Sequence, residues 1–244
     1  MMTAKIAIVT GASRGIGAGI ARQLASEGYD IAFSYPRDAA SAQDTIRAVE
    51  ALGRRALAVQ ADGSTVEGNE KIVAETIRAF GRLDVLVCNA GMYPKGTIDD
   101  ITPEVIEAGL NLNVRGPMIE TMCAVKHMQS GGRIILMGSS FGGRAPLPGL
   151  SLYSSTKAAL RGFAQGVARD LGNRGITINV VEPGPVNTAM NPSDTDAAKV
   201  LASFVATGAY GEIEDIVNVV SFLVNERSSY ITGSALAVDG GLLA

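Results

Sequence analysis

The segment KIAIVTGASRGIGAGIARQLASEG, residues 5–28, carries the strongest indication of the fold. Its apolar run Lys5–Thr10 has strand character and enters a glycine-rich turn, after which a helical pattern extends over Gly15–Glu27. Glycines in such a turn let a phosphate approach the backbone, and the first turn of the helix offers free N–H groups and a positive dipole end. The spacing Gly-x3-Gly-x-Gly differs from the GxGxxG fingerprint. The segment predicts a dinucleotide site, with a purely structural turn as the alternative.

The same alternation of apolar strands and helices continues along the chain. Beyond the first unit, the predicted strands are Asp30–Tyr35, Ala56–Gln60, Val85–Cys88, Arg133–Met137, Thr177–Val181 and Ala235–Val238. The predicted helices are Ala39–Leu52, Val66–Phe80, Pro103–Gln129, Ser151–Leu171 and Ile213–Val224. Apolar strands between helices indicate a parallel sheet buried on both faces, and right-handed crossovers favour a doubly wound arrangement. We therefore expect an α/β fold in which one domain, residues 1–244, has a seven-stranded, mostly parallel sheet with helices on both faces.

The composition narrows the class of protein. Of the 244 residues, 47% are hydrophobic and 5% aromatic, which suits helices packed closely on a sheet. A net charge of −3 argues against a broad nucleic-acid-binding face. Cys88 and Cys123 lie in apolar segments and suggest neither a disulfide nor a metal site. The apolar run within residues 1–10 is too short for a signal peptide, because Thr10–Gly11 interrupts it. No run of about 18 apolar residues occurs. We therefore expect a cytoplasmic protein without a membrane span.

The end of the second predicted strand bears on the kind of dinucleotide. NAD-binding folds usually carry Asp or Glu about 20 residues after the glycines, on the ribose hydroxyls. Tyr35 holds about that position here, Arg37 follows it, and Arg14 lies inside the glycine turn. Two guanidinium groups without a carboxylate suit a 2′-phosphate, which predicts NADP. Asp38 is a nearby carboxylate that argues against a 2′-phosphate. The alternative is that Arg14 and Arg37 are ordinary surface charges.

A second pattern lies in LYSSTKAAL, residues 152–160. Tyr153 and Lys157 are four residues apart on a predicted helix and fall on one of its faces. A phenol pKa of about 10 is too high for easy proton exchange near neutrality, and an adjacent ammonium lowers it. Ser140, thirteen residues upstream, supplies a hydroxyl to hold a carbonyl oxygen, whereas Ser139 lacks that spacing. The set predicts carbonyl/alcohol redox chemistry, with an unremarkable tyrosine and a solvated lysine as the alternative.

Taken in order, these segments resemble the short-chain dehydrogenase/reductase family over essentially the whole chain. Within the family, the chain is similar to the branch of 3-oxoacyl-carrier-protein reductases and carbonyl reductases. No single piece is decisive, but their joint order and spacing are specific. The matching segments are TGASRGIG at 10–17, Asp62 in VQADG, CNAG at 88–91, LNLNVRG at 110–116, Ser140, Tyr153 and Lys157, EPGPVNT at 182–188 and ITGSALAVDGG at 231–241.

The resemblance implies a Rossmann fold and an NADPH-dependent reductase that transfers a hydride between nicotinamide and a ketone, a β-keto carbonyl or a secondary alcohol. Tyr153 is then the general acid, and Lys157 lowers its pKa and holds the nicotinamide ribose. Ser140 binds the substrate oxygen, and Asn113 supports a water-linked proton path to Lys157. These four residues form the expected catalytic set.

The resemblance also implies the residues that hold the cofactor, with Asp62 at the adenine and Pro183, Gly184 and Thr188 beside the nicotinamide. The expected contacts are Gly11, Ser13, Arg14, Gly15, Ile16, Gly17, Tyr35, Arg37, Ala61, Asp62, Gly63, Asn89, Ala90, Gly91, Tyr153, Lys157, Pro183, Gly184, Val186 and Thr188. The expected partner is a small-molecule carbonyl substrate, with no nucleic acid, membrane or metal. Two helices carry apolar residues on more than one face and need more cover than one sheet gives, namely Met118, Met122, Val125, Phe163 and Val167. The family resemblance implies that a homotetramer provides this cover.

Substrate choice is expected to depend on two segments whose sequences show no regular pattern. Asn187–Gly211 lacks periodicity and predicts a mobile loop with short helices at most, and Met92–Ile101 is the second such segment. An apolar, roomy pocket is predicted from Gly142, Gly143, Pro146, Leu147 and Leu150.

Three residues depart from the family pattern. Cys88 stands where Asn is common, and we expect a small buried residue there. Gly63 replaces an apolar residue and is expected to loosen the adenine pocket. Glu182, before Pro183, is an unusual carboxylate near the site, or else a group paired with helix or backbone.

A regulatory protein on the same fold is the alternative to an enzyme. The stretch from GGRIILMGSS to RGITINVVEPGP also resembles bacterial oxidoreductase-like proteins proposed to bind a cyclic dinucleotide in biofilm dispersal. The complete set of serine, tyrosine, lysine and asparagine favours the enzyme.

Overall fold

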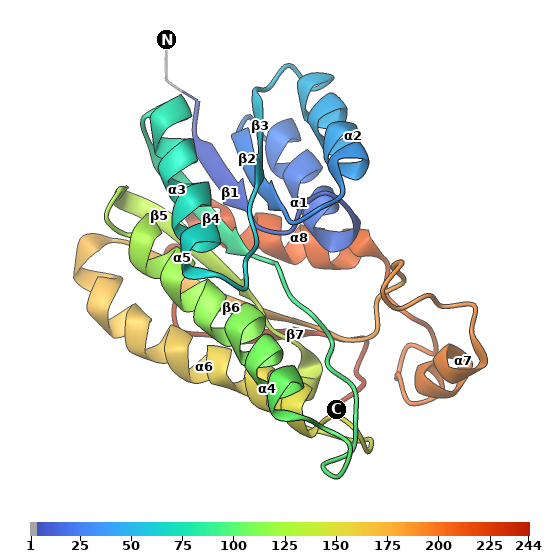
Figure 1. Cartoon of the computed structure of the whole chain (residues 1–244). Coiled ribbons are helices and arrows are strands. Elements are labelled where there is room, and N and C mark those ends of the chain that lie inside the picture. The colour runs from blue at the N-terminus through green and yellow to red at the C-terminus, as the bar shows by residue number, and fades with distance from the viewer. Residues whose placement is uncertain (1–3) are drawn as a thin grey trace.

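A computed structural model describes residues 4–244 and shows one sheet with helices on both faces (Figure 1). The first three residues, part of the segment considered for a leader, lie outside the described residues. The seven strands are parallel throughout and run in the order β3-β2-β1-β4-β5-β6-β7. This order confirms the doubly wound Rossmann arrangement. The strands are β1 (Ile6–Val9), β2 (Asp30–Tyr35), β3 (Ala56–Gln60), β4 (Leu83–Cys88), β5 (Met128–Met137), β6 (Thr177–Pro183) and β7 (Ala235–Val238).

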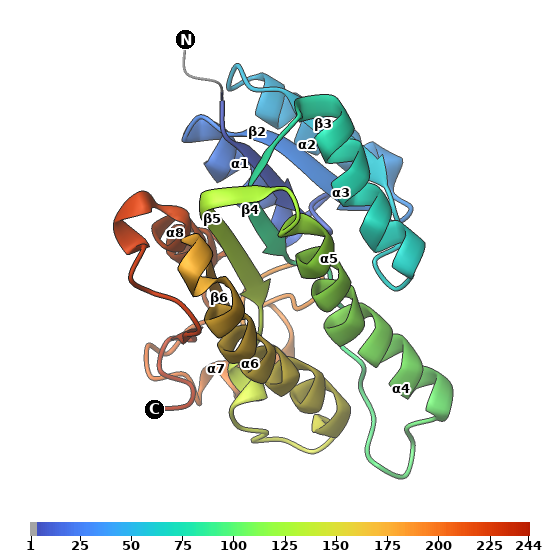
Figure 2. The ribbon, with the colours of Figure 1, turned by 90° about the vertical axis from the view of Figure 1, so that its left-hand side faces the viewer.

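The helices form two layers, one on each face of the sheet (Figures 1 and 2). One layer holds α1 (Gly15–Ser26), α2 (Ala39–Glu50) and α8 (Ile213–Val224). The other holds α3 (Val66–Phe80), α5 (Gly116–Ala124) and α6 (Ser151–Leu171), with α4 (Pro103–Leu110) leading into α5. In the part of the chain that the structure describes, no helix is both long and apolar enough to cross a bilayer.

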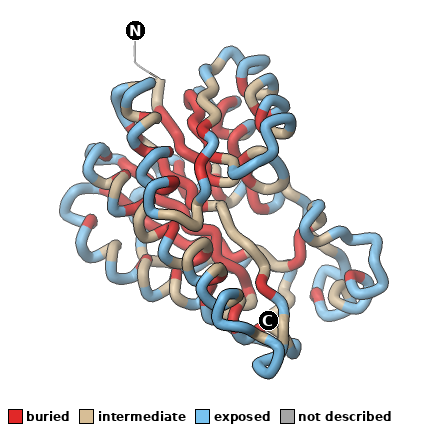
Figure 3. The backbone as a smooth tube through the Cα atoms, in the orientation of Figure 1, coloured by how far each residue is buried: buried red, intermediate tan, exposed pale blue. Residues whose placement is uncertain are grey.

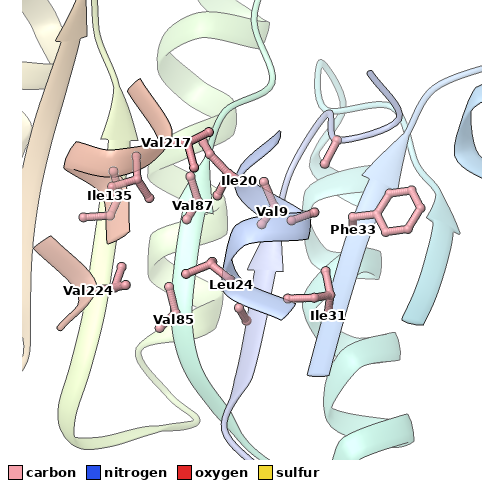
Figure 4. Close-up of a cluster of buried hydrophobic side chains, with 14 of the residues drawn as sticks. Val9, Ile20, Leu24, Ile31, Phe33, Val85, Val87, Ile135, Val217 and Val224 are labelled. Carbon is pink, nitrogen blue, oxygen red and sulfur yellow. The ribbon is translucent and has the colours of Figure 1, made fainter. Parts of the chain in front are cut away.

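The core lies between each layer and the sheet, where the backbone is mostly buried (Figure 3). Strand residues alternate between the two faces, so Val9 and Val87 pack under α1 and α8, while Ile8 and Leu86 pack under α3 and α5. Figure 4 shows the first of these clusters, which includes Phe33 of β2. Both faces of every inner strand are therefore apolar, which is why these strands read as continuous hydrophobic runs.

Helix ends follow local chemistry. The Asp38 carboxylate accepts from the Ser41 N–H at the start of α2, and the Thr65 hydroxyl accepts from the Gly68 N–H at the start of α3. Helix α3 ends at Gly81, whose φ of 76° is left-handed. The bounds predicted for α3, α6 and α8 are confirmed, and those of α1 and α2 differ by one or two residues at their ends.

The predicted helix Pro103–Gln129 is wrong in its extent. Helix α4 passes through a π-helical turn, Asn111–Arg115, into α5, which ends at Ala124. Met128 and Gln129 already belong to β5, and Met128 pairs with Leu83 of β4. The apolar spacing of the helix continues by coincidence into Met128, so the pattern alone places the boundary too late.

The aperiodic segment Asn187–Gly211 confirms the prediction of a loop with short helices at most. It contains one helix, α7 (Asp196–Ala202), which stands away from the sheet beyond the carboxyl ends of the strands (Figure 1). The sheet order reverses between β1 and β4, and the crevice at that point is the usual binding site of such sheets.

Candidate active site

A cavity of about 590 Å³ lies at the carboxyl ends of the strands. It is lined by all of the predicted cofactor contacts except Tyr35. The other lining residues, none of which was among the predicted cofactor contacts, are Ser34, Pro36, Asp38, Met92, Tyr93, Lys95, Leu112, Met137, Gly138, Ser139, Phe141, Pro185, Ala189, Met190, Asn191 and Leu201. Of the predicted catalytic set, Tyr153 and Lys157 line the cavity, whereas Ser140 and Asn113 do not.

The glycine turn forms one end of the cavity. Gly15 has a φ of 59°, and a Cβ there would meet no atom within 4 Å, so the backbone faces open space. Position 17 requires glycine for a different reason, because a Cβ at Gly17 would lie 2.5 Å from Asn89 Nδ2. That amide donates to the carbonyls of Thr10 and Gly11 and joins the turn to the CNAG segment. The first turn of α1 contains no acidic residue and can accept an anion.

Two arginines and two carboxylates lie around the same end. Asp38 accepts from the Ser41 N–H at 3.0 Å and its hydroxyl at 2.6 Å, and these bonds hold the pKa of Asp38 below its usual value. The Ser64 hydroxyl donates to the Asp62 carboxylate, and this hydrogen bond is the largest cause of the lowered pKa of Asp62. Asp38 therefore serves as the cap of α2. No hydrogen bond within residues 4–244 engages the guanidinium of Arg14 or of Arg37.

The prediction that Tyr35 lines the cofactor site is wrong. Side chains alternate along β2, so Ser34 and Pro36 face the cavity while Tyr35 packs against the core under α1 and α2. The Ser34 hydroxyl accepts from the Gly11 N–H at 3.1 Å, which ties β2 to the glycine turn. The count of residues from the glycines does not reveal this alternation.

Tyr153 and Lys157 form the opposite end of the cavity, both on α6. Lys157 Nζ donates to the Met137 carbonyl at 2.7 Å and lies 5.8 Å from the Tyr153 ring centroid. Burial lowers the pKa of Lys157 to about 8, so the ammonium form still dominates at neutral pH. Burial also raises the pKa of Tyr153, and the hydrogen bond with Ser139 opposes that rise. The expected lowering of the phenol pKa by Lys157 is not found, because the ammonium is directed at the Met137 carbonyl.

The serine that faces Tyr153 is Ser139, and the prediction of Ser140 is wrong. Ser139 lines the cavity and bonds to Tyr153, and its hydroxyl also accepts from the Phe141 N–H at 3.2 Å. Ser140 is 1% exposed, and its Oγ has no hydrogen-bond partner within the described structure. Successive side chains leave the end of β5 in opposite directions, and the loop to α6 is one residue longer than the spacing rule assumes.

Asn113 lies in the π-helical turn and is buried beside the catalytic helix. Its side chain accepts from the Met92 N–H and donates to the Met92 carbonyl, both at 2.9 Å, and also donates to Thr156 Oγ1 at 3.1 Å. A Cβ at Gly91 would lie 3.4 Å from Asn113 Oδ1 and 3.6 Å from Lys157 Nζ, so both groups face the same small space. The asparagine therefore fixes Met92 and α6, and the water-linked path remains a prediction.

The wall of the substrate end agrees with the sequence in part. The two aperiodic segments line it as expected, through Met92, Tyr93, Met190 and Leu201, and Phe141 of the turn after β5 joins them. The residues predicted from the loop before α6 do not line the cavity, namely Gly142, Gly143, Pro146, Leu147 and Leu150. The Tyr93 ring meets the Tyr153 ring edge-on, with centroids 4.6 Å apart. Lys95 brings one cation to the same end.

The departures from the family pattern have structural explanations. Cys88 is buried and unpaired, and burial raises the pKa of its thiol. Leu112 lies 3.1 Å from the place of a Cβ at Gly63 and takes up the space that a side chain would fill. Glu182 pairs with Arg161 of α6, which confirms the pairing alternative. No group of His, Cys, Asp or Glu within residues 4–244 has the arrangement of a metal site.

Glu120 of α5 is a buried carboxyl that the sequence did not indicate. Thr10 Oγ1 donates to Glu120 at 3.4 Å and accepts from the Asn89 and Ala90 N–H groups at 3.1 Å each. Burial raises the pKa of Glu120 to about 7. The residue supports the CNAG segment from behind and lies outside the cavity.

Comparison with known proteins gives consistent matches over the whole chain. A family model described as enoyl-(acyl carrier protein) reductase matches residues 11–243. Hydroxynaphthalene reductase arp2 of Aspergillus fumigatus is 38% identical over 246 residues, 95% of this chain and 90% of that protein. The cyclic-di-GMP-binding biofilm dispersal mediator protein of Escherichia coli is 36% identical, over 98% of this chain and 97% of that protein. A solved short-chain dehydrogenase from Burkholderia cenocepacia, in complex with NADP, has a TM-score of 0.97 at 46% identity and covers 98% of both chains.

Proposed function

The chain belongs to the short-chain dehydrogenase/reductase family, and from that premise we propose that it is an NADPH-dependent reductase of small ketones and β-keto carbonyls, reversible on secondary alcohols. The observation that carries the proposal is one cavity with a phosphate cradle at one end and Ser139, Tyr153 and Lys157 at the other. The neighbour bound to NADP and the relative that is a hydroxynaphthalene reductase support it. The two unpaired cysteines fit the cytoplasmic location that we propose with it.

The residues present fit NADPH. Gly15 leaves open space before the N-terminus of α1 for the pyrophosphate, and Arg14 and Arg37 provide two cations for a 2′-phosphate. Asp38, the carboxylate that would oppose this, is held by Ser41. Asp62 also lines the cavity, and it is the residue that we propose for the adenine amine.

The chain's own share of the reaction is to place the carbonyl and supply a proton. When bound, NADPH supplies the hydride. Tyr153 donates the proton of its Oη to the substrate oxygen, and Ser139 Oγ hydrogen-bonds the same oxygen as negative charge gathers there. The Lys157 ammonium holds the nicotinamide ribose, and Asn113 holds Met92 and α6 in place around it.

Cofactor choice is the first expected result. We expect wild-type kcat/KM to be higher with NADPH than with NADH, and Arg37→Ala to lower the NADPH value by about tenfold to a hundredfold, since a charge-assisted bond contributes about 1.5–3 kcal/mol. Steady-state kinetics with both cofactors measures this. Arg78→Ala removes an exposed arginine of α3 outside the cavity and is the matched control. Equal use of both cofactors by the wild type would contradict the assignment.

A nucleotide-binding regulatory protein is the second candidate, because the relative from Escherichia coli is named for binding cyclic-di-GMP. NADPH oxidation with a panel of ketones and β-ketoesters, and calorimetry with cyclic dinucleotides, separate the two candidates. Turnover of a ketone supports the reductase. Tight cyclic-dinucleotide binding without turnover of any ketone would support the regulator.

We also propose that residues 187–211 act as a lid over the substrate end. Thr188, Met190 and Leu201 line the cavity from this segment, whereas Val200 and Phe204 are exposed. Hydrogen exchange at 187–211 is expected to slow when NADP(H) is added, while α3 serves as an internal reference. Equal exchange with and without cofactor would argue against closure.

A homotetramer is the proposed assembly. Ile106, Leu110 and Met122 are exposed on α4 and α5, and Phe222 is exposed on α8, so these helices present apolar surface that the monomer does not cover. Light scattering at micromolar concentration is expected to give the mass of four chains, and a monomer there would overturn this part.

A further inference from the structure

Arg161 and Glu182 form an ion pair just outside the cavity. Arg161 Nε and Nη2 bond to the two carboxylate oxygens of Glu182 at 2.5 Å each, a bidentate arrangement that fixes both position and orientation. The Glu182 side chain is 1% exposed. Arg161 follows Lys157 by one helical turn on α6, and Glu182 precedes Pro183 at the end of β6. The pair therefore joins the catalytic helix to the strand that leads into the nicotinamide side of the cavity.

The segment that carries Ser139 rests on this pair. A Cβ at Gly138 would lie 3.1 Å from Glu182 Cγ, and a Cβ at Gly143 would lie 2.6 Å from Arg161 Nη2. The Gly138 N–H also donates to the Val181 carbonyl of β6 at 2.7 Å. Both ends of residues 138–143 thus lie against one partner of the pair. A Cβ at Gly143 would displace the Arg161 guanidinium, whereas a Cβ at Gly138 would first meet Val180 Cγ1 of β6, at 2.6 Å.

Stability alone does not account for the pair. Removing a carboxylate from water is costly, and buried ion pairs can often be replaced by apolar residues without loss of stability. Asp30, paired with Arg54 and Arg55 at 2.6 Å each, provides a comparison at the same depth. That pair lies at the start of β2, at the amino edge of the sheet and away from the cavity, whereas Glu182 lies at the carboxyl end of β6, next to Pro183 and Gly184, which line the cavity.

We propose that Arg161 and Glu182 are positioning residues, which hold Ser139 and the Pro183–Gly184 turn in register with Tyr153. The inference rests on the proposed reductase function and adds residues that touch neither substrate nor cofactor. A displacement of about 1 Å at a reacting group can lower the rate about a hundredfold. Loss of the Arg161–Glu182 pair is therefore expected to lower kcat.

The test compares Glu182→Gln, Arg161→Gln and the double variant with the wild type. Each single variant is expected to lower kcat for ketone reduction by about tenfold to a hundredfold. Calorimetry is expected to show the Kd of NADPH changed by less than about threefold, because the phosphate and adenine contacts remain. The double variant is expected to be no slower than the slower single variant, since the two residues act as one unit. Asp30→Asn, the matched control, is expected to lower Tm and leave kcat unchanged.

Hydrogen exchange at residues 138–143, in the absence of substrate, separates this inference from the proposed function. Faster exchange there in both single variants, with α3 unchanged, supports positioning even if the wild type reduces none of the ketones tested; in that case only the reductase proposal fails. Unchanged exchange at 138–143, or variants that lose Tm but keep the wild-type kcat, would overturn the positioning role.

Discussion

Tyr153→Phe is expected to lower kcat for ketone reduction by about 10²- to 10⁴-fold, the usual contribution of a general acid. The substitution keeps the ring and its edge contact with Tyr93, and removes only the hydroxyl that donates the proton. Burial raises the pKa of this phenol, so the wild-type group is almost fully protonated at neutral pH and ready to act as an acid. The rate of NADPH oxidation, followed by its absorbance, measures the effect.

The affinity for NADPH distinguishes the loss of a proton donor from the loss of the site. Tyr153→Phe is expected to leave the Kd of NADPH nearly unchanged, whereas Lys157→Ala is expected to raise it and to lower kcat as well. The combined variant is expected to be little slower than the worse single variant, because the residues act as a unit. Tyr29→Phe is the control, since Tyr29 is buried just before β2 and lies outside the cavity. Substantial activity in Tyr153→Phe would place the chemistry elsewhere and favour the regulatory candidate.

The fold could be predicted almost completely from the sequence, for a physical reason. Strands buried on both faces must be apolar throughout, so β1, β2 and β4 stand out as short hydrophobic runs between amphipathic helices. The boundary that failed lies between α5 and β5, where Met128 continues the spacing of the helix although it pairs with β4. A buried methionine suits either element, and only the pairing of the strands decides between them.

The site was predictable where function depends on residue type at a fixed spacing within one element. Tyr153 and Lys157 are four residues apart on one helix, and helical geometry alone brings them to one face. The errors at Tyr35 and Ser140 have another cause. Each residue lies at the end of a strand, where the direction of a side chain depends on register and loop length rather than on the number of residues to the next motif.

Other parts of the site depend on contacts between distant segments. The apolar wall at the substrate end combines Tyr93, Phe141 and Met190 from three loops, and no local pattern links them. Glu120 and Glu182 are similar cases, because each is a carboxyl in an apolar stretch whose partner lies far along the chain. Sequence patterns indicate that such residues are unusual but do not identify what they contact.

The two adjacent serines provide the sharpest test of the site. Ser139→Ala is expected to lower kcat by about 10²- to 10³-fold, the usual cost of one lost donor to a developing oxyanion. Ser139 also forms the hydrogen bond that partly offsets the raised pKa of Tyr153. Without that bond the phenol pKa rises further, so the alkaline limb of the kcat profile is expected to move to higher pH. Ser139→Thr retains a hydroxyl and is expected to recover part of the rate.

Ser140→Ala is the matched control, one residue away and in the same turn. Its hydroxyl is buried and has no hydrogen-bond partner in the described structure, so its removal is expected to change kcat by less than about threefold and to leave Tm equal or slightly higher. Kinetics and thermal unfolding of both alanine variants decide the assignment. A large loss of activity in Ser140→Ala with near wild-type activity in Ser139→Ala would contradict this assignment. Ser140, thirteen residues before Tyr153, would then be the serine that holds the substrate oxygen.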